Sequence, residues 1–428
     1  MTERPASRPS LGARGVLAIA DFRRLFVAQT ISDVGDGFTF ITLLFVVNQL
    51  THSTAALAVM SIAVALPQMT IGLIAGAYAD RLDRRRIMLA SDGMRGLLVL
   101  GFVATATMDR LPLLYVLAFV QASIGTFFTP ARGALVPRVV PPDGLLAANS
   151  ISQVARIIAN LVGTGIAGVV VALTGTIWPS FVIDAATFFA SVAIVYGVSR
   201  DVGRPEAAAA GDHPSIGASV GAGLAAIRAS RTLTATVVGV AGAMLGLGAV
   251  NVLFVPFLVN VLHESTVWAG PLEAAQTVSM ILAGGVVATL AARLRPSTII
   301  TGAMFGVAVI VGLFSIVPNV FALMALLFAV GWFVTPLQAA STTLLQTATA
   351  DAMRGRVLAA FQAATSTTTI ISTAAAGILA DIISVRTVVA IGGGIVALGA
   401  LAAWLLFLAD RRHPAATSPA DANRAAAA

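Results

Sequence analysis

The chain has 428 residues, of which 58% are hydrophobic and 11% are charged, and its mean hydropathy is +0.93. Soluble domains carry about 25% charged residues, so this composition excludes a soluble globular protein. The net charge of +7 comes from 26 arginines in a chain without lysine, and these arginines form no basic domain for nucleic acid. Because the chain has no cysteine, disulfides and thiolate metal sites are excluded, and the four scattered histidines lack metal-ligand spacing.

Long apolar runs recur along the whole chain. A helix needs about 20 apolar residues to cross a bilayer core, whereas a membrane β-strand shows about ten residues of alternating polarity. The runs here are long and continuous, which excludes a β-barrel and predicts an all-α membrane protein. Twelve transmembrane helices are expected, at residues 25–47, 55–79, 87–108, 112–135, 145–173, 177–198, 233–261, 269–291, 297–317, 320–345, 357–382 and 387–408.

These twelve spans fall into two groups of six, separated by one long polar stretch. We expect a cytoplasmic leader, an N-terminal six-helix bundle, a cytoplasmic linker, a C-terminal six-helix bundle and a disordered cytoplasmic tail, at residues 1–24, 25–198, 199–232, 233–408 and 409–428. Arginines gather at the N-terminus, in alternate loops, in the linker and in the tail. By the positive-inside rule both termini are cytoplasmic.

Short segments repeat between the two groups of spans. "VNQLTHST" (47–54) matches "VNVLHEST" (259–266) at five of eight positions, and "LAAN" (146–149) matches "LAAF" (358–361) at the same offset of 212. "TPARGAL" (129–135) and "TPLQAAS" (335–341) share their first residues at an offset of 206. The repeat predicts two homologous halves related by an axis along the membrane normal, a plan found in transporters with a substrate site near the midplane.

Two aspartates interrupt the first apolar run. If this span begins near Leu25, Asp33 lies about 12 Å and Asp36 about 16 Å into it, at 1.5 Å per residue. Their spacing of three puts both carboxylates on one helix face, and a charge at this depth must face protein, water or a partner. Arg156 and Asp184 reach a similar depth, so we expect a buried charge network of Asp36, Arg156 and Asp184 beside Asp33.

Two interpretations of this network are open. It is either a structural clamp that never titrates, or a proton-coupling site in which small movements shift a carboxylate between its protonated and ionised forms. At an offset of 212 the three network positions become Gly248, Thr368 and Val396. The fold evidently does not need the charges in its second half, which favours a functional role.

The loop between spans 2 and 3, "GAYADRLDRRRIML" (76–89), resembles the signature of the major facilitator superfamily. The residues that carry the resemblance are Gly76, Asp80, Arg81, Arg84 and Arg85, while Asp83 stands where the family usually has glycine, which puts its tight turn in doubt. The resemblance implies that Asp80 contacts the start of span 11 and that the loop acts as a conformational latch. The phrases "LFVAQTISDVGDGFTFITLLFVV", "TPARGALVPRVVPPDGLLAANSI" and "FVIDAATFFAS" resemble a narrower subgroup of macrolide, tetracycline and enterobactin exporters.

These observations predict a monomeric exporter of amphipathic small molecules in the bacterial cytoplasmic membrane, which works by proton antiport and alternating access without a cofactor or a metal. An uptake carrier or facilitator for a specific metabolite is the alternative. A membrane-embedded transferase is the alternative from another class, but no histidine lies in a span. Candidates for the lining of the substrate cavity are Phe38, Gln121, Asn149, Asn160, Asn251 and Gln338.

Overall fold

The computed structural model describes residues 12–71, 82–203 and 216–412. Within these ranges all regular elements are helices, and ten of them are long and apolar enough to cross a membrane. A helix suits an apolar surrounding because it satisfies its own backbone hydrogen bonds. The expected span 55–79 lies partly outside the described residues, and twelve crossings stay a prediction.

Contacts divide the chain into two units, Met1–Asp212 with Val255–Ala274, and His213–Phe254 with Ala275–Ala428. The segment Val255–Ala274 therefore packs with the first unit, although the sequence assigns it to the second bundle.

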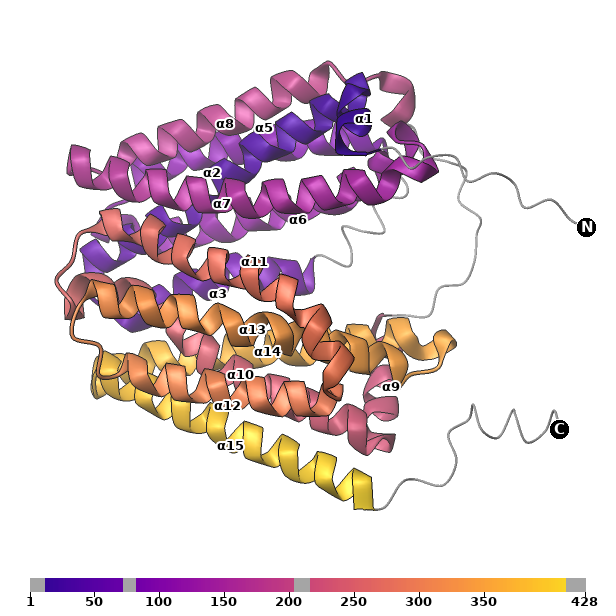
Figure 1. Cartoon of the computed structure of the whole chain (residues 1–428). Coiled ribbons are helices and arrows are strands. Elements are labelled where there is room, and N and C mark those ends of the chain that lie inside the picture. Colours follow the sequence, from indigo (N-terminus) through magenta and orange to yellow (C-terminus); the bar gives the residue numbers. More distant parts are fainter. Residues whose placement is uncertain (1–11, 72–81, 204–215, 413–428) are drawn as a thin grey trace, which may run out of the picture. The chain divides into compact units, whose positions relative to one another are not determined.

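In the first unit, α2 packs against both α7 and α8, and α5 packs against both α6 and α8. These helices run side by side in the upper part of Figure 1. The helices of this unit are α1 (Ala13–Ala18), α2 (Ala20–Thr51), α3 (Thr54–Thr70), α5 (Arg84–Thr105), α6 (Leu111–Val139), α7 (Leu145–Thr174) and α8 (Trp178–Tyr196), with short 3-10 turns at Met108–Arg110, Pro142–Gly144 and Arg200–Gly203.

In the second unit, α12 packs against both α13 and α15, and α9, which comes from the predicted linker, packs against α14. The helices are α9 (Ile216–Ala229), α10 (Arg231–Pro256), α11 (Ala269–Arg293), α12 (Pro296–Phe314), α13 (Val320–Thr347), α14 (Asp351–Ile382) and α15 (Val385–Arg412), of which α10 and α11 also run into the segment that packs with the first unit.

Local sequence explains several helix ends. Ser53 and Asn319 precede α3 and α13, and each accepts a hydrogen bond from a backbone N–H of the first turn. Asp83 does the same for α5, accepting from the N–H of Arg86 at 3.1 Å, in an extended conformation with φ −62° and ψ 110°. The aspartate that departs from the family signature thus starts a helix and needs no glycine-type turn.

Two glycines let α2 and α7 approach closely. A Cβ atom on Gly37 would lie 2.6 Å from the carbonyl oxygen of Asn160, and one on Gly163 would overlap the carbonyl oxygen of Val34. The contact fixes the rotation of both helices, because any larger residue at either position would separate them. It therefore helps to set which way the polar side chains of α2 and α7 point.

The segment Val255–Ala274 is joined to the first unit by polar contacts. Asn48 near the end of α2 and Asn260 in the π-helical turn Phe257–Val261 exchange two amide hydrogen bonds, of 3.1 and 2.9 Å. The Thr266 hydroxyl, in the short turn Thr266–Trp268, donates to the carbonyl oxygen of Gly168 on α7 at 3.1 Å. Asn48 and Asn260 are 212 residues apart, so the pair joins two equivalent positions of the sequence repeat.

Candidate functional site

The first unit contains a polar cavity of about 730 Å³ between α2, α3, α5, α6 and α7. This volume is in the range of small-molecule sites. Much of its lining is polar, and among the described residues five charged ones line it: Asp33, Asp36, Arg95, Arg132 and Arg156. Such a concentration of charge inside an apolar helix bundle makes this cavity the candidate functional site.

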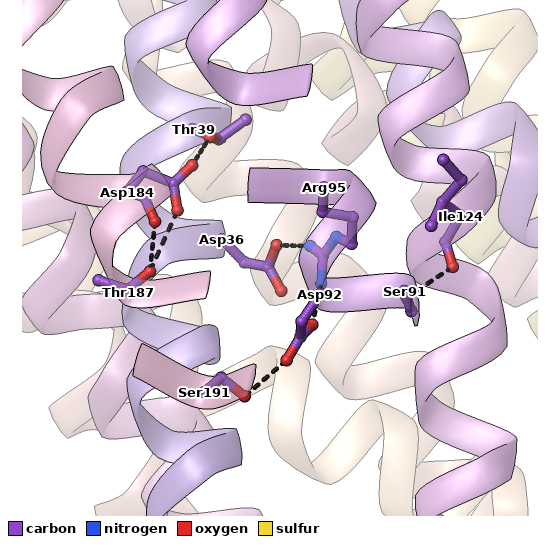
Figure 2. Close-up of polar contacts among 9 residues, drawn as sticks. All are labelled: Asp36, Thr39, Ser91, Asp92, Arg95, Ile124, Asp184, Thr187 and Ser191. Atoms are coloured by element: carbon purple, nitrogen blue, oxygen red, sulfur yellow. Dashed lines mark hydrogen bonds and ion pairs between the residues drawn. The ribbon is translucent and has the colours of Figure 1, made fainter. Parts of the chain in front are cut away.

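Arg95 of α5 lies between two aspartates (Figure 2). It donates a hydrogen bond to Asp36 of α2, and its Nη1 atom is 3.6 Å from Asp92 Oδ1. The side chains of Arg95 and Asp92 are 6% and 0% exposed, whereas that of Asp36 is 38% exposed. Asp36 is therefore the member of this charge triad (Asp36, Asp92 and Arg95) that is open to the cavity.

Neighbouring helices hold the charge triad in place. Ser191 of α8 donates to Asp92 Oδ2 at 2.5 Å, and the Arg95 guanidinium lies 4.2 Å from the centre of the Phe188 ring. Gly125 of α6 makes room for the guanidinium, since a Cβ atom there would be 3.2 Å from Arg95 Nε. The arginine is thus positioned by α2, α6 and α8 together.

Asp184 of α8 is fully buried beside this triad. It accepts hydrogen bonds from the hydroxyls of Thr39 and Thr187, the second at 3.3 Å (Figure 2). Among the described residues Asp184 has no ion pair within 4 Å. It is therefore a hydrogen-bonded neighbour of the triad.

The predicted pairing of Asp36 with Arg156 is wrong. Arg156 on α7 instead donates to Gln153 Oε1 at 2.9 Å, and it lies near Asp33 together with Arg132 of α6. Asp36 and Arg156 do lie at similar depths along their helices, and this depth can be estimated from the sequence. Direction around the helix axis does not match, because packing turns Asp36 toward Arg95 of α5 and leaves Arg156 bonded to Gln153 on its own helix.

The structure also places the other cavity candidates. Gln121, Asn149 and Asn160 line this cavity, and their contact with a substrate stays a prediction. Phe38 does not line the cavity, because it is 1% exposed and packed inside the first unit. Asn251 and Gln338 are exposed residues of the second unit.

The predicted latch is described only in part. Gly76, Asp80 and Arg81 lie outside the described residues. Arg84 and Arg85 are buried, and Arg85 Nη2 donates to the carbonyl oxygen of Tyr196 at 2.5 Å while its guanidinium lies over the Tyr196 ring. In this structure Arg85 thus fastens the start of α5 to the end of α8.

Three functional candidates were missed in the sequence. Asp92 and Arg95 lie three residues apart inside an apolar run, which is the signal that singled out Asp33 and Asp36. Arg95 follows the start of α5 by 11 residues, or about 16 Å, which matches the depth estimated for Asp36. Arg132 falls near the end of the expected span 112–135, and α6, which continues to Val139, carries it on the cavity wall.

Comparisons with known proteins agree with this architecture. Residues 13–424 match the family described as transmembrane secretion effector. The chain is 26% identical to the enterobactin exporter EntS of Escherichia coli K12 over 402 residues, which cover 93% of this chain and 94% of EntS. It is 30% identical to the MFS-type transporter YfiS of Bacillus subtilis over 178 residues, which cover 41% of this chain and 42% of YfiS.

Solved structures show the same fold at low sequence identity. The nucleoside transporter NupG superposes with a TM-score of 0.75 at 13% identity and covers 90% of this chain and 98% of NupG. A bacterial homologue of the iron transporter ferroportin in its inward-facing state gives 0.72 at 14% identity, with 91% and 99% covered. Because the family match spans nearly the whole sequence, this multi-pass chain belongs to the transmembrane secretion effector family of the major facilitator superfamily.

Proposed function

We propose that this transporter exports an amphipathic small molecule from the bacterial cytoplasm in exchange for protons, by alternating access. It acts as a monomer in the cytoplasmic membrane. The similarity to the enterobactin exporter supports the direction of transport. The polar cavity of the first unit supports a small-molecule cargo.

The charge triad carries the proposal for proton exchange. Two carboxylates share one arginine, so the fully ionised triad has one negative charge in excess. A buried net charge is costly, and binding of one proton removes it. A purely structural clamp would need only one acid for one base.

Asp36 is the member that exchanges the proton. Its side chain is the one open to the cavity, so water or cargo can reach it. When Asp36 is protonated, Arg95 keeps Asp92 as its partner and does not become an unpaired buried cation. Asp33 and Asp184 are the acids that neighbour this proton-exchanging residue.

The latch that switches the protein between its two access states consists of Gly76, Asp80, Arg81, Arg84 and Arg85.

The test is transport into inside-out proteoliposomes with an acidic lumen. Labelled enterobactin, a macrolide and tetracycline serve as probes. Wild-type protein is expected to concentrate at least one probe in the lumen. Asp36→Asn is expected to lose this pH-driven accumulation by tenfold or more while it still exchanges probe at equal concentrations, because binding and switching do not need the proton.

Asp21→Asn is the matched control, since Asp21 also lies on α2 but pairs with the exposed Arg24 at the end of the helix. It should transport like the wild type. If Asp36→Asn still accumulates probe like the wild type, Asp36 has a structural role and does not couple transport to protons. Movement of every probe only down its own gradient would identify a facilitator.

A further inference from the structure

The charges that face the cavity are unevenly matched. Asp36 is held by Arg95, which Asp92 also contacts. This leaves Asp33 as the acid beside Arg132 and Arg156. All three residues line the cavity, so two guanidinium groups lie within electrostatic reach of one carboxylate, without an ion pair within 4 Å among the described residues.

Neither arginine of this pair has a closed salt bridge among the described residues. Arg156 is exposed to the cavity, and its side chain donates to the neutral amide of Gln153 at 2.9 Å. Arg132 Nε and Asp33 Oδ2 are buried without a hydrogen-bond partner in the described part of the chain. An unpaired buried guanidinium nitrogen is costly, so the site is prepared for a partner that arrives from outside the chain.

The unpaired polar atoms on the wall are mainly donors. Arg95 Nε, Gln121 Nε2 and Arg132 Nε are buried N–H groups of lining residues that lack an acceptor among the described residues. Asp33 Oδ2 is the corresponding carboxylate oxygen, and the Ser152 hydroxyl, which can donate or accept, is the remaining unpaired group of the described lining. A ligand with oxygen acceptors would therefore form hydrogen bonds with more of these unpaired groups than a ligand with donors.

We propose that the exported molecule carries an anionic oxygen group, such as a carboxylate, which binds between Arg132 and Arg156. Guanidinium groups suit this role because their planar N–H donors match two oxygens at once. Asp33 is the resident counter-ion of the two arginines and competes with the ligand anion for them. This inference rests on the proposed export function, but it concerns a different arginine set from the proton-exchanging triad.

Charge on the cargo has an energetic consequence. An inside-negative membrane potential expels anions, because moving a charge across the membrane changes its free energy in proportion to the potential. Export of an anion would thus draw on the potential in addition to the proton gradient.

The test compares two probes with one skeleton, 1-naphthoate and the neutral 1-naphthalenemethanol, by equilibrium dialysis against the full-length protein in detergent. Naphthoate is expected to bind wild-type protein at least tenfold more tightly than the alcohol. Arg156→Gln should weaken naphthoate binding about tenfold and leave the alcohol unchanged, while Arg156→Lys should restore part of the loss. Asp33→Asn should tighten naphthoate binding severalfold, because it removes the competing carboxylate.

Arg86→Gln is the matched control, since Arg86 is 84% exposed and contacts Asp83 outside the cavity. It should bind both probes like the wild type, and the unfolding midpoint of each variant shows that it is folded. Equal binding of the two probes, no binding of naphthoate at millimolar concentration, or naphthoate binding that Arg156→Gln and Asp33→Asn leave unchanged would overturn the anion site. None of these outcomes bears on pH-driven accumulation, which tests the export function separately.

Discussion

Asp36 in the first unit and Gly248 in the second are 212 residues apart and occupy the same position of the sequence repeat. Asp36 opens onto the cavity, whereas a Cβ atom on Gly248 would already lie 2.8 Å from Ser372 Cβ on α14. The same position of the repeat thus carries a charged side chain in one unit and allows close helix packing in the other.

The other charged positions follow the same contrast. Asp92 and Arg95 correspond to Met304 and Val307, which are both fully buried. Arg156 corresponds to Thr368, whose hydroxyl donates to the carbonyl of Ala364 in its own helix. Asp184 corresponds to the buried Val396. At the other offset, of 206, Arg132 corresponds to Gln338. The second unit folds with neutral residues at every one of these positions, so the charges of the first unit are not a requirement of the helix packing.

The largest loss of stability is expected from a substitution at Arg95. Arg95→Val copies the second unit and leaves Asp92 buried without its cation, which should lower the free energy of unfolding by about 3–5 kcal/mol. The triple variant Asp36→Gly, Asp92→Met and Arg95→Val copies all three neutral residues and should recover at least half of that loss. Thermal unfolding in detergent measures both, and a triple variant less stable than the single one would show that the fold itself depends on the charges.

A substitution at Gly248 in the second unit should cause a smaller loss of stability, which comes from overpacking and not from an unpaired charge. Gly248→Ala should lower the free energy of unfolding by about 1–3 kcal/mol through overpacking against Ser372. Gly133→Ala on α6 is the matched control, since a Cβ atom there meets nothing within 4 Å and alanine favours a helix by about 1 kcal/mol. Equal stability of the two variants would mean that α10 and α14 tolerate separation at this position.

The smallest effect is expected where the repeat keeps the same residue in both copies. Asn48 and Asn260 exchange two hydrogen bonds, so a double-mutant cycle with Asn48→Ala and Asn260→Ala should give a coupling energy of about 0.5–1.5 kcal/mol. The four unfolding free energies provide this number. A coupling energy of zero would mean that the two amides bond to water as well as to each other.

The sequence predicts where the helices of this chain lie better than it predicts how each helix is rotated about its own axis. Apolar length is a local property, so the runs located the long helices of the described residues, while the helices themselves extend further, as in α2 from Ala20 to Thr51. The partner of Asp36 depends on which face of each helix points inward. That face is set by contacts such as Gly37 with Asn160, which join residues distant in sequence.

The same reasoning explains which site residues could be predicted. Asp33 and Asp36 were found because charge in an apolar run is visible in the sequence alone, and the same rule, applied to "SDGMRG", would have found Asp92 and Arg95. The division of the two aspartates between different arginines could not be predicted, because residues on one helix face still point to different neighbours. Only the packed structure separates the charge triad from the Arg132 and Arg156 pair.

All the cations that face the cavity are arginines, and this limits how its charge can change. A guanidinium group does not lose its proton in proteins, so Arg95, Arg132 and Arg156 form a constant positive background. Any change in the net charge of the cavity must come from its carboxylates or from a bound molecule. The cavity thus resembles an ion-exchange resin, in which the fixed charges stay and only the counter-ions are replaced.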